Sequence, residues 1–160
     1  MSTLAVDSIT NATGTSAIGI TSGGVVTQSN IVAFMAQKGD TTTLGANAST
    51  GIAFNRTTLS HSSWNGTTFT TPIAGIYRFF LTGHHQSMSS NGAEIAIYVN
   101  GASYVTGYSH NSTGTRQRMV CEAIVPLQVG DTIDFRVLQG DVFAGGSPGS
   151  GIMCTGHLLG

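Results

Sequence analysis

Short apolar runs that alternate with polar residues dominate the chain from residue 31 onward. At positions 132–138, Ile133, Phe135 and Val137 alternate with polar or charged neighbours, which is the two-residue period of a strand with one buried face. No window keeps a 3.6-residue apolar period over the length of a helix. The pattern therefore predicts an all-β sandwich of about eight to ten strands.

Turn residues divide this pattern into elements. Asn65-Gly66 and Asn100-Gly101 are typical two-residue hairpin turns, and residues 38–50, rich in Gly, Thr and Asn, predict a loop. The expected strands are 31–36, a short one at 52–54, a pair that brackets 64–70, and then 76–81, 94–99, 102–108, 116–127, 132–138 and 152–159.

The stretch 69–81 carries more apolar surface than one sheet face can bury. Within this stretch, a turn with Pro72 and Gly75 precedes a strand at 76–81. Its two faces carry Ile76, Arg78 and Phe80 on one side, and Tyr77, Phe79 and Leu81 on the other. A strand that is apolar on both faces is expected between two layers, either two layers of the domain or the domain and a second subunit. The pattern leaves open which face is the core.

Residues 1–30 differ from the rest, because single apolar residues are separated by Ser, Thr, Asn and Gly. Too few large side chains are present to bury a core. We therefore expect an attachment arm, 1–30, that docks on a partner, followed by one domain, 31–160. The apolar residues expected to attach the arm are Leu4, Val6, Ile9, Ile18 and Ile20.

Charge and apolar run length exclude several kinds of partner. The net charge is -1 and the Lys and Arg residues form no run, so we expect no nucleic-acid partner. No apolar run approaches the ~20 residues of a membrane span, and no secretory signal is recognisable, so we expect no membrane association. Cys121 and Cys154 lie in apolar runs, which favours free buried thiols and leaves a disulfide as the alternative.

Candidate catalytic and metal-binding residues do not assemble into a known motif. His84 and His85 are adjacent in a strand and so point to opposite faces, which does not suit a single ion. No carboxylate or cysteine stands at ligand spacing from the other histidines, His61, His110 and His157. The acidic residues form no close pair, and neither a Gly-x-Ser-x-Gly elbow nor a P-loop occurs. We expect no enzyme activity, no metal and no cofactor.

Four segments, in order, are similar to one known family. Phe69, Gly75, Tyr77 and Phe79 have the spacing of the central signature of C1q-like heads. Three further segments resemble the first strand, the Leu-x-x-Gly-Asp turn and the closing strand of that family, at 32–36, 127–133 and 155–159. The resemblance to the C1q/TNF-like family implies a ten-stranded jelly-roll sandwich that forms homotrimers, here with an extended N-terminal arm. It implies that five residues divide between core and trimer interface, namely Tyr77, Phe79, Leu81, Tyr98 and Phe135.

The arm carries a second, shorter resemblance. Residues 4–14, Leu-Ala-Val-Asp-Ser-Ile-Thr-Asn-Ala-Thr-Gly, resemble the opening of small virion proteins of tailed bacteriophages, especially those of cyanobacterial hosts. No collagen-like Gly-x-y stem, common in animal C1q relatives, precedes the head. The resemblance implies a virion protein that is made in the host cytoplasm.

These expectations favour a homotrimeric capsid decoration (cement) protein. Its arm would hold it to the major capsid protein or to another virion protein. The alternative is a short tail-fibre tip or receptor-binding knob, whose Ser-, Thr- and Asn-rich loops recognise host surface glycans. A third possibility, a secreted C1q-like lectin, is disfavoured because signal and stem are missing.

Overall fold

A computed structural model describes residues 8–10, 16–28, 31–39, 43–85, 92–109, 117–143 and 151–160. It divides into two compact units, Met1–Ile31 and Val32–Gly160. Every regular element in these described ranges is a β-strand, and no helix long and apolar enough to cross a membrane is found among them.

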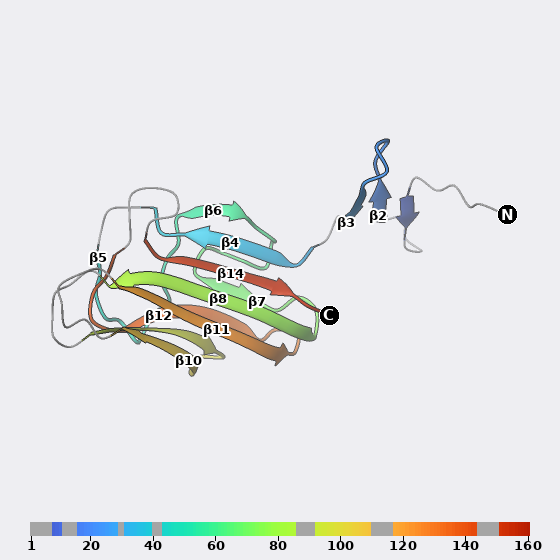
Figure 1. Cartoon of the computed structure of the whole chain (residues 1–160). Helices are drawn as coiled ribbons and strands as arrows, with labels where there is room; N and C mark the ends of the chain where they lie inside the picture. Colours follow the sequence, from blue (N-terminus) through green and yellow to red (C-terminus); the bar gives the residue numbers. More distant parts are fainter. Residues whose placement is uncertain are drawn as a thin grey trace. The chain divides into compact units, whose positions relative to one another are not determined.

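The larger sheet of the second unit is built around β8 (Gly75–His85). On one side, β11 (Arg118–Leu127) pairs with β8 over ten residue pairs, from Arg118↔His84 to Leu127↔Gly75. On the other side lie β14 (Met153–Leu158), β4 (Ala33–Gln37) and β6 (Arg56–Leu59), in that order (Figure 1). The short β13 (Val142–Phe143) joins the end of β8 to β5 (Thr43–Leu44).

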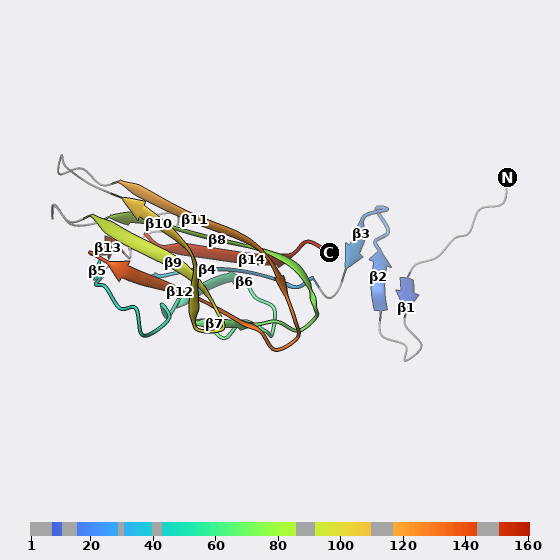
Figure 2. The same cartoon turned by 90° about the horizontal axis from the view of Figure 1, so that it is seen from below.

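The second sheet has the order β10 (Ala102–Ser109), β9 (Ala93–Val99), β12 (Thr132–Gln139) and β7 (Thr68–Thr70). All pairings in both sheets are antiparallel. Figure 2 shows β9 and β12 in a separate layer from β8 and β11. The expected all-β jelly-roll sandwich is therefore confirmed.

Aromatic side chains fill the space between the two sheets. The ring of Phe34 on β4 stacks on Trp64, with centroids 4.3 Å apart and planes 1° from parallel. The Phe34 centroid also lies 5.4 Å from that of Phe69 and 6.2 Å from those of Phe79 and Phe135. Since these rings come from both sheets, one contiguous aromatic cluster holds the sandwich together.

This cluster determines how the central strand is oriented. The side chains of Tyr77, Phe79 and Leu81 are completely buried within a single chain. Ile76 and Arg78, which alternate with them, are exposed. The question that the sequence left open is thus decided, because the core side of β8 is the face that carries Tyr77.

Several predicted elements agree with the structure, and the β9–β10 hairpin is the clearest. Asn100 and Gly101 both have positive φ, 51° and 79°, as a two-residue hairpin turn of mirror-image type requires. In β12, Ile133, Phe135 and Val137 are buried while their neighbours are more exposed, as the alternation predicts.

Three expectations about strands were wrong. The predicted strand at 52–54 does not form, because the amide of Ile52 donates to Phe135 O and that of Phe54 to Gly66 O, so no continuous ladder can develop. The pair expected around 64–70 is one strand, β7, plus a single Trp64–Phe69 bridge. The described part of 32–160 has eleven strands where ten were expected. Two of them, β5 and β13, have only two residues each, and β5 lies in the segment that was predicted to be a loop.

The two cysteines are free and buried. Both stand in register with Leu81, Cys121 on β11 and Cys154 on β14, one on each side of β8. Two strand spacings, about 10 Å, therefore separate their Cα atoms, whereas a disulfide needs less than about 7 Å. The structure favours the thiols over the disulfide alternative.

The first unit is a small antiparallel sheet of β1 (Ser8–Thr10), β2 (Ser16–Ile20) and β3 (Val26–Gln28). The extended arm that the sequence predicted is not confirmed, because the described residues of this unit pair as a sheet. Ile9 stands opposite Ile18, and Ile20 opposite Val26, so their side chains share one face. Ser8 and Gly19, paired with each other, belong to the other face. Leu4 and Val6 lie outside the described residues.

The aromatic cluster leaves no room beside Gly156 on β14. A Cβ at this position would overlap Phe34 and lie only 2.7 Å from Cδ1 of Phe79. We expect Gly156→Ala to lower the free energy of unfolding by about 1–3 kcal/mol through overpacking, measured by urea denaturation at fixed protein concentration. Gly160→Ala is the matched control, since no atom lies within 4 Å of its Cβ position. Equal stability of the two variants would contradict the packing argument.

Burial also controls the reactivity of both thiols. Burial raises the pKa of the Cys121 thiol to about 11 and that of Cys154 well above its ordinary value, so thiolate is scarce at neutral pH. We expect neither thiol to react with Ellman's reagent in the folded protein, and both to react after unfolding in guanidinium. Rapid reaction of either one in the native state would show that the strand around it opens.

Candidate interaction surface

The solvent-facing side of the larger sheet is unusually apolar at its centre. Ile76 on β8 and Val120 and Ile124 on β11 are each about half exposed, at 48%, 49% and 57%. Ile124 stands opposite Arg78, and Pro126 opposite Ile76, so these side chains form one continuous surface across the two strands. We call the exposed residues Ile76, Arg78, Val120, Glu122 and Ile124, with the partly buried Phe80, the β8–β11 face.

The alternation of buried and exposed residues along β11 explains why this face is apolar. In β11, every second residue from Met119 to Leu127 is buried and the intervening ones are exposed. The intervening positions include Val120, Ile124 and Pro126, where a solvent-exposed strand ordinarily carries polar side chains. The apolar character of the β8–β11 face therefore comes from the outward positions of both strands.

The two charges on the β8–β11 face neutralise each other. Nε of Arg78 donates to Oε1 of Glu122 at 2.7 Å, with both side chains 40% or more exposed. An exposed pair of this kind contributes little to stability. Its consequence is electrostatic, because covering Arg78 and Glu122 together leaves neither of them as a lone buried charge. Arg118, at the next outward position of β11 beyond Val120, borders the face and donates from Nε to Oγ1 of Thr82.

The outer face of the other sheet is polar by comparison. The guanidinium of Arg136 lies 3.9 Å above the ring of Tyr98, and its Nη2 donates to Oδ2 of Asp134 at 2.9 Å. Asp134 raises the pKa of Arg136. The hydrogen bonds from the Gln128 amide and from Asn100 lower the pKa of Asp131 in the neighbouring turn. These contacts fix local structure.

The structure places the sequence-derived site residues in two environments. Four of the five, Tyr77, Phe79, Leu81 and Phe135, lie in the core of a single chain. Tyr98 lies beneath Arg136 on the outer face of the second sheet. None belongs to the β8–β11 face. Sequence reasoning missed Val120 and Ile124, although the alternation along 118–127 was a signal that could have identified them.

The described histidines and acidic residues do not gather into a metal site. Within these ranges no three His, Cys, Asp or Glu residues come close enough to hold a metal ion. His61 contacts the hydroxyl of Ser63 at 3.0 Å, and His85 is buried with both ring nitrogens unpartnered. His84 is partly buried beside it, His157 lies on β14, and His110 is outside the described residues.

Comparison of the sequence with models of protein families finds one matching family. The model of the C1q domain matches residues 33–159. Comparison with curated protein sequences finds no match.

Solved structures with the same fold include three animal proteins. The globular domain of zebrafish complement 1qA protein has a TM-score of 0.63 and 18% identity, covering 82% of this chain and 98% of that one. The Eiger TNF of S. frugiperda has a TM-score of 0.63 and 11% identity, covering 81% and 93%. Murine APRIL has a TM-score of 0.56 and 10% identity, covering 81% and 100%. At these identities the likeness shows the fold alone.

Proposed function

The chain belongs to the C1q domain family, and from this premise we propose that it is a homotrimeric virion protein that decorates a bacteriophage capsid. The observation that supports a homotrimer is the β8–β11 face. Homotrimers are characteristic of the C1q/TNF-like fold, as the resemblance implied, and a subunit in such a trimer needs an apolar, charge-compensated surface.

Three properties of the β8–β11 face support a second copy of the chain as its partner. It is apolar where a solvated sheet face is usually polar. It lies on the two adjacent strands with the longest pairing in the fold, which gives it a rigid backbone. Its only charges, on Arg78 and Glu122, already form an ion pair, so covering them leaves no lone buried charge.

Attachment to the shell is assigned to the N-terminal unit. Ile9, Ile20 and Val26 are exposed by 51%, 38% and 62% on one face of a three-stranded sheet. A sheet this small, with an apolar face, gains stability by packing against another surface. Its described residues carry no charge, so the partner site we propose is an apolar surface on the major capsid protein or another virion protein.

The virion assignment itself rests on the resemblance of residues 4–14 to the opening of small virion proteins of tailed phages. A trimer carries three such arms, which multiplies the effective affinity for a repetitive lattice. A capsid shell offers that lattice.

The alternative, a tail-fibre tip or receptor-binding knob, is favoured by one observation. Tyr104 and Tyr108 on β10 are 51% and 54% exposed, and exposed aromatic rings suit contacts with the apolar faces of sugars. Copy number separates the two functions. Hundreds of copies per particle, by gel densitometry of purified virions, support the shell, whereas a few copies support the tail.

The first test concerns assembly. We expect Ile124→Asp to convert the trimer to monomer in sedimentation velocity, because each interface would bury an unpaired carboxylate. Tyr104→Asp is the matched control, since it places the same charge at a similarly exposed aromatic position on the other sheet. A trimeric Ile124→Asp protein would refute the β8–β11 face as the subunit contact.

The second test concerns attachment. We expect deletion of residues 1–30 to leave a folded trimer that no longer co-sediments with undecorated capsids. The double variant Ile9→Ser, Ile20→Ser should weaken binding at least tenfold, because two exposed apolar anchors are lost. Ser8→Asn, on the opposite face of the small sheet, should bind like wild type. Decoration by the truncated trimer would refute the attachment role.

A further inference from the structure

A histidine on β14 adjoins the β8–β11 face. His157 stands in register with Arg78, and the Cβ direction of its neighbour Gly156 is toward Phe34 in the core, so the side chain of His157 points outward with that of Arg78. Side chains directly opposite each other on adjacent antiparallel strands have Cβ atoms about 4.5–5.5 Å apart. His157 is already partly buried in the single chain. A partner that covers the β8–β11 face therefore covers His157 as well.

The arginine opposite His157 is engaged on its other side. Nε of Arg78 donates to Oε1 of Glu122 at 2.7 Å, and Glu122 lies on β11, across β8 from β14. Two strand spacings, about 10 Å, therefore separate Glu122 from His157. With a neutral His157 the charges of Arg78 and Glu122 balance. Protonation of His157 adds a second positive charge directly beside Arg78, and Glu122 is both farther away and already paired.

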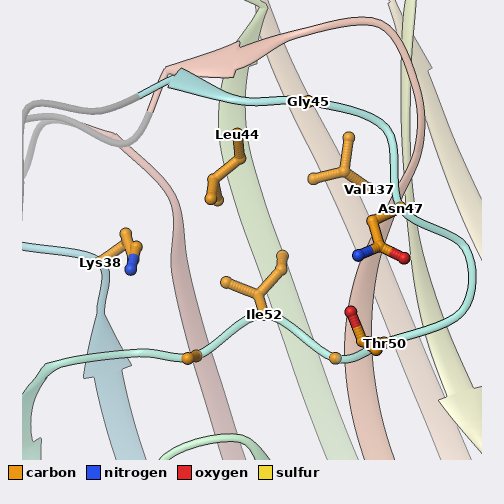
Figure 3. A pocket seen from close by; sticks show the side chains of 9 residues that line it. Lys38, Leu44, Gly45, Asn47, Thr50, Ile52 and Val137 are labelled. Atoms are coloured by element: carbon orange, nitrogen blue, oxygen red, sulfur yellow. The ribbon is translucent and has the colours of Figure 1, made fainter.

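The charged and titratable groups on the β4 side lie farther from His157. The residue opposite it on β4 is Ala33, which is uncharged. Figure 3 shows Lys38 beside a hollow at the other end of that strand, five residues or about 17 Å from Ala33. His61 lies beyond β4, where its amide donates to Ala33 O and its ring contacts Ser63.

The same holds along β8 and β14. His84 and Arg118 stand opposite each other near the end of β8, six residues or about 20 Å from Arg78. Gly160, whose O accepts the Ile76 amide hydrogen, lies three residues beyond His157, at about 10 Å along the strand. Arg78 is thus the charged group that a protonated His157 meets at the closest spacing.

We propose that His157 is a pH switch of the homotrimer, whose protonation separates the subunits. This inference rests on the proposed function, because it requires a second copy of the chain over the β8–β11 face. A neutral imidazole can be covered at small cost, whereas an imidazolium would lose its water next to the like charge of Arg78. Histidine changes its charge between about pH 8 and 5, where carboxylates and arginine keep theirs. The separated chains bind this proton more readily than the trimer does, so acidification favours the monomer.

Sedimentation velocity of the full chain at about pH 7.5 and about pH 5.5, at one ionic strength, tests the switch. The protein concentration at which half of the chains are trimeric should rise at least about tenfold at the lower pH, because every trimer contains three such like-charged pairs. The far-UV circular dichroism spectrum should stay that of a β-sandwich, because dissociation leaves each domain folded. Loss of this spectrum at the lower pH would mean acid unfolding and would overturn the switch.

Substitutions assign the effect to one side chain. His157→Gln is neutral throughout, so its trimer should be equally stable at both pH values. His157→Lys is charged throughout, so its trimer should be weak at both. His61→Gln is the matched control, since it removes another partly buried histidine outside the face and should leave the wild-type pH response unchanged. Dissociation of His157→Gln on acidification, or a His157→Lys trimer as stable as wild type at neutral pH, would overturn the assignment.

The trimer and the switch fail in different ways. A wild-type chain that is monomeric at neutral pH would refute the trimer, and with it the switch. A wild-type trimer of equal stability at both pH values would refute the switch alone.

Discussion

The stack of Phe34 on Trp64 is the constraint on which the rest of the domain depends. Phe34 lies on β4 of the larger sheet, and its contacts with Phe69 and Phe135 of the second sheet join the two layers. Once this cluster is fixed, Tyr77, Phe79 and Leu81 must point inward. The outward residues of β8 then follow from the alternation of the strand, and they meet the outward residues of β11 in the β8–β11 face.

The sequence predicted the elements that a local pattern specifies. The alternation of Ile133, Phe135 and Val137 defined β12, and Asn100-Gly101 defined a hairpin, because each signal is contained in the segment it describes. The segment 52–54 shows the limit of this reasoning. Its apolar residues are buried, but their backbone amides bond two different segments, a long-range fact that no local window contains.

The same limit explains why the sequence did not identify the candidate sites. Both faces of residues 76–81 carry large apolar groups, so only the position of the aromatic cluster in space could decide which face was outward.

The positions of Cys121 and Cys154 around Leu81 have a consequence for the environments that the fold tolerates. Strand β8 lies between the two cysteines, so an oxidising medium cannot join them by a disulfide within one folded chain. A reducing medium has no disulfide to break in this domain, because both thiols are free. The covalent structure of the domain is therefore the same on both sides of a cell envelope. A protein with this arrangement can fold in a reducing compartment and enter an oxidising one with no change in its core.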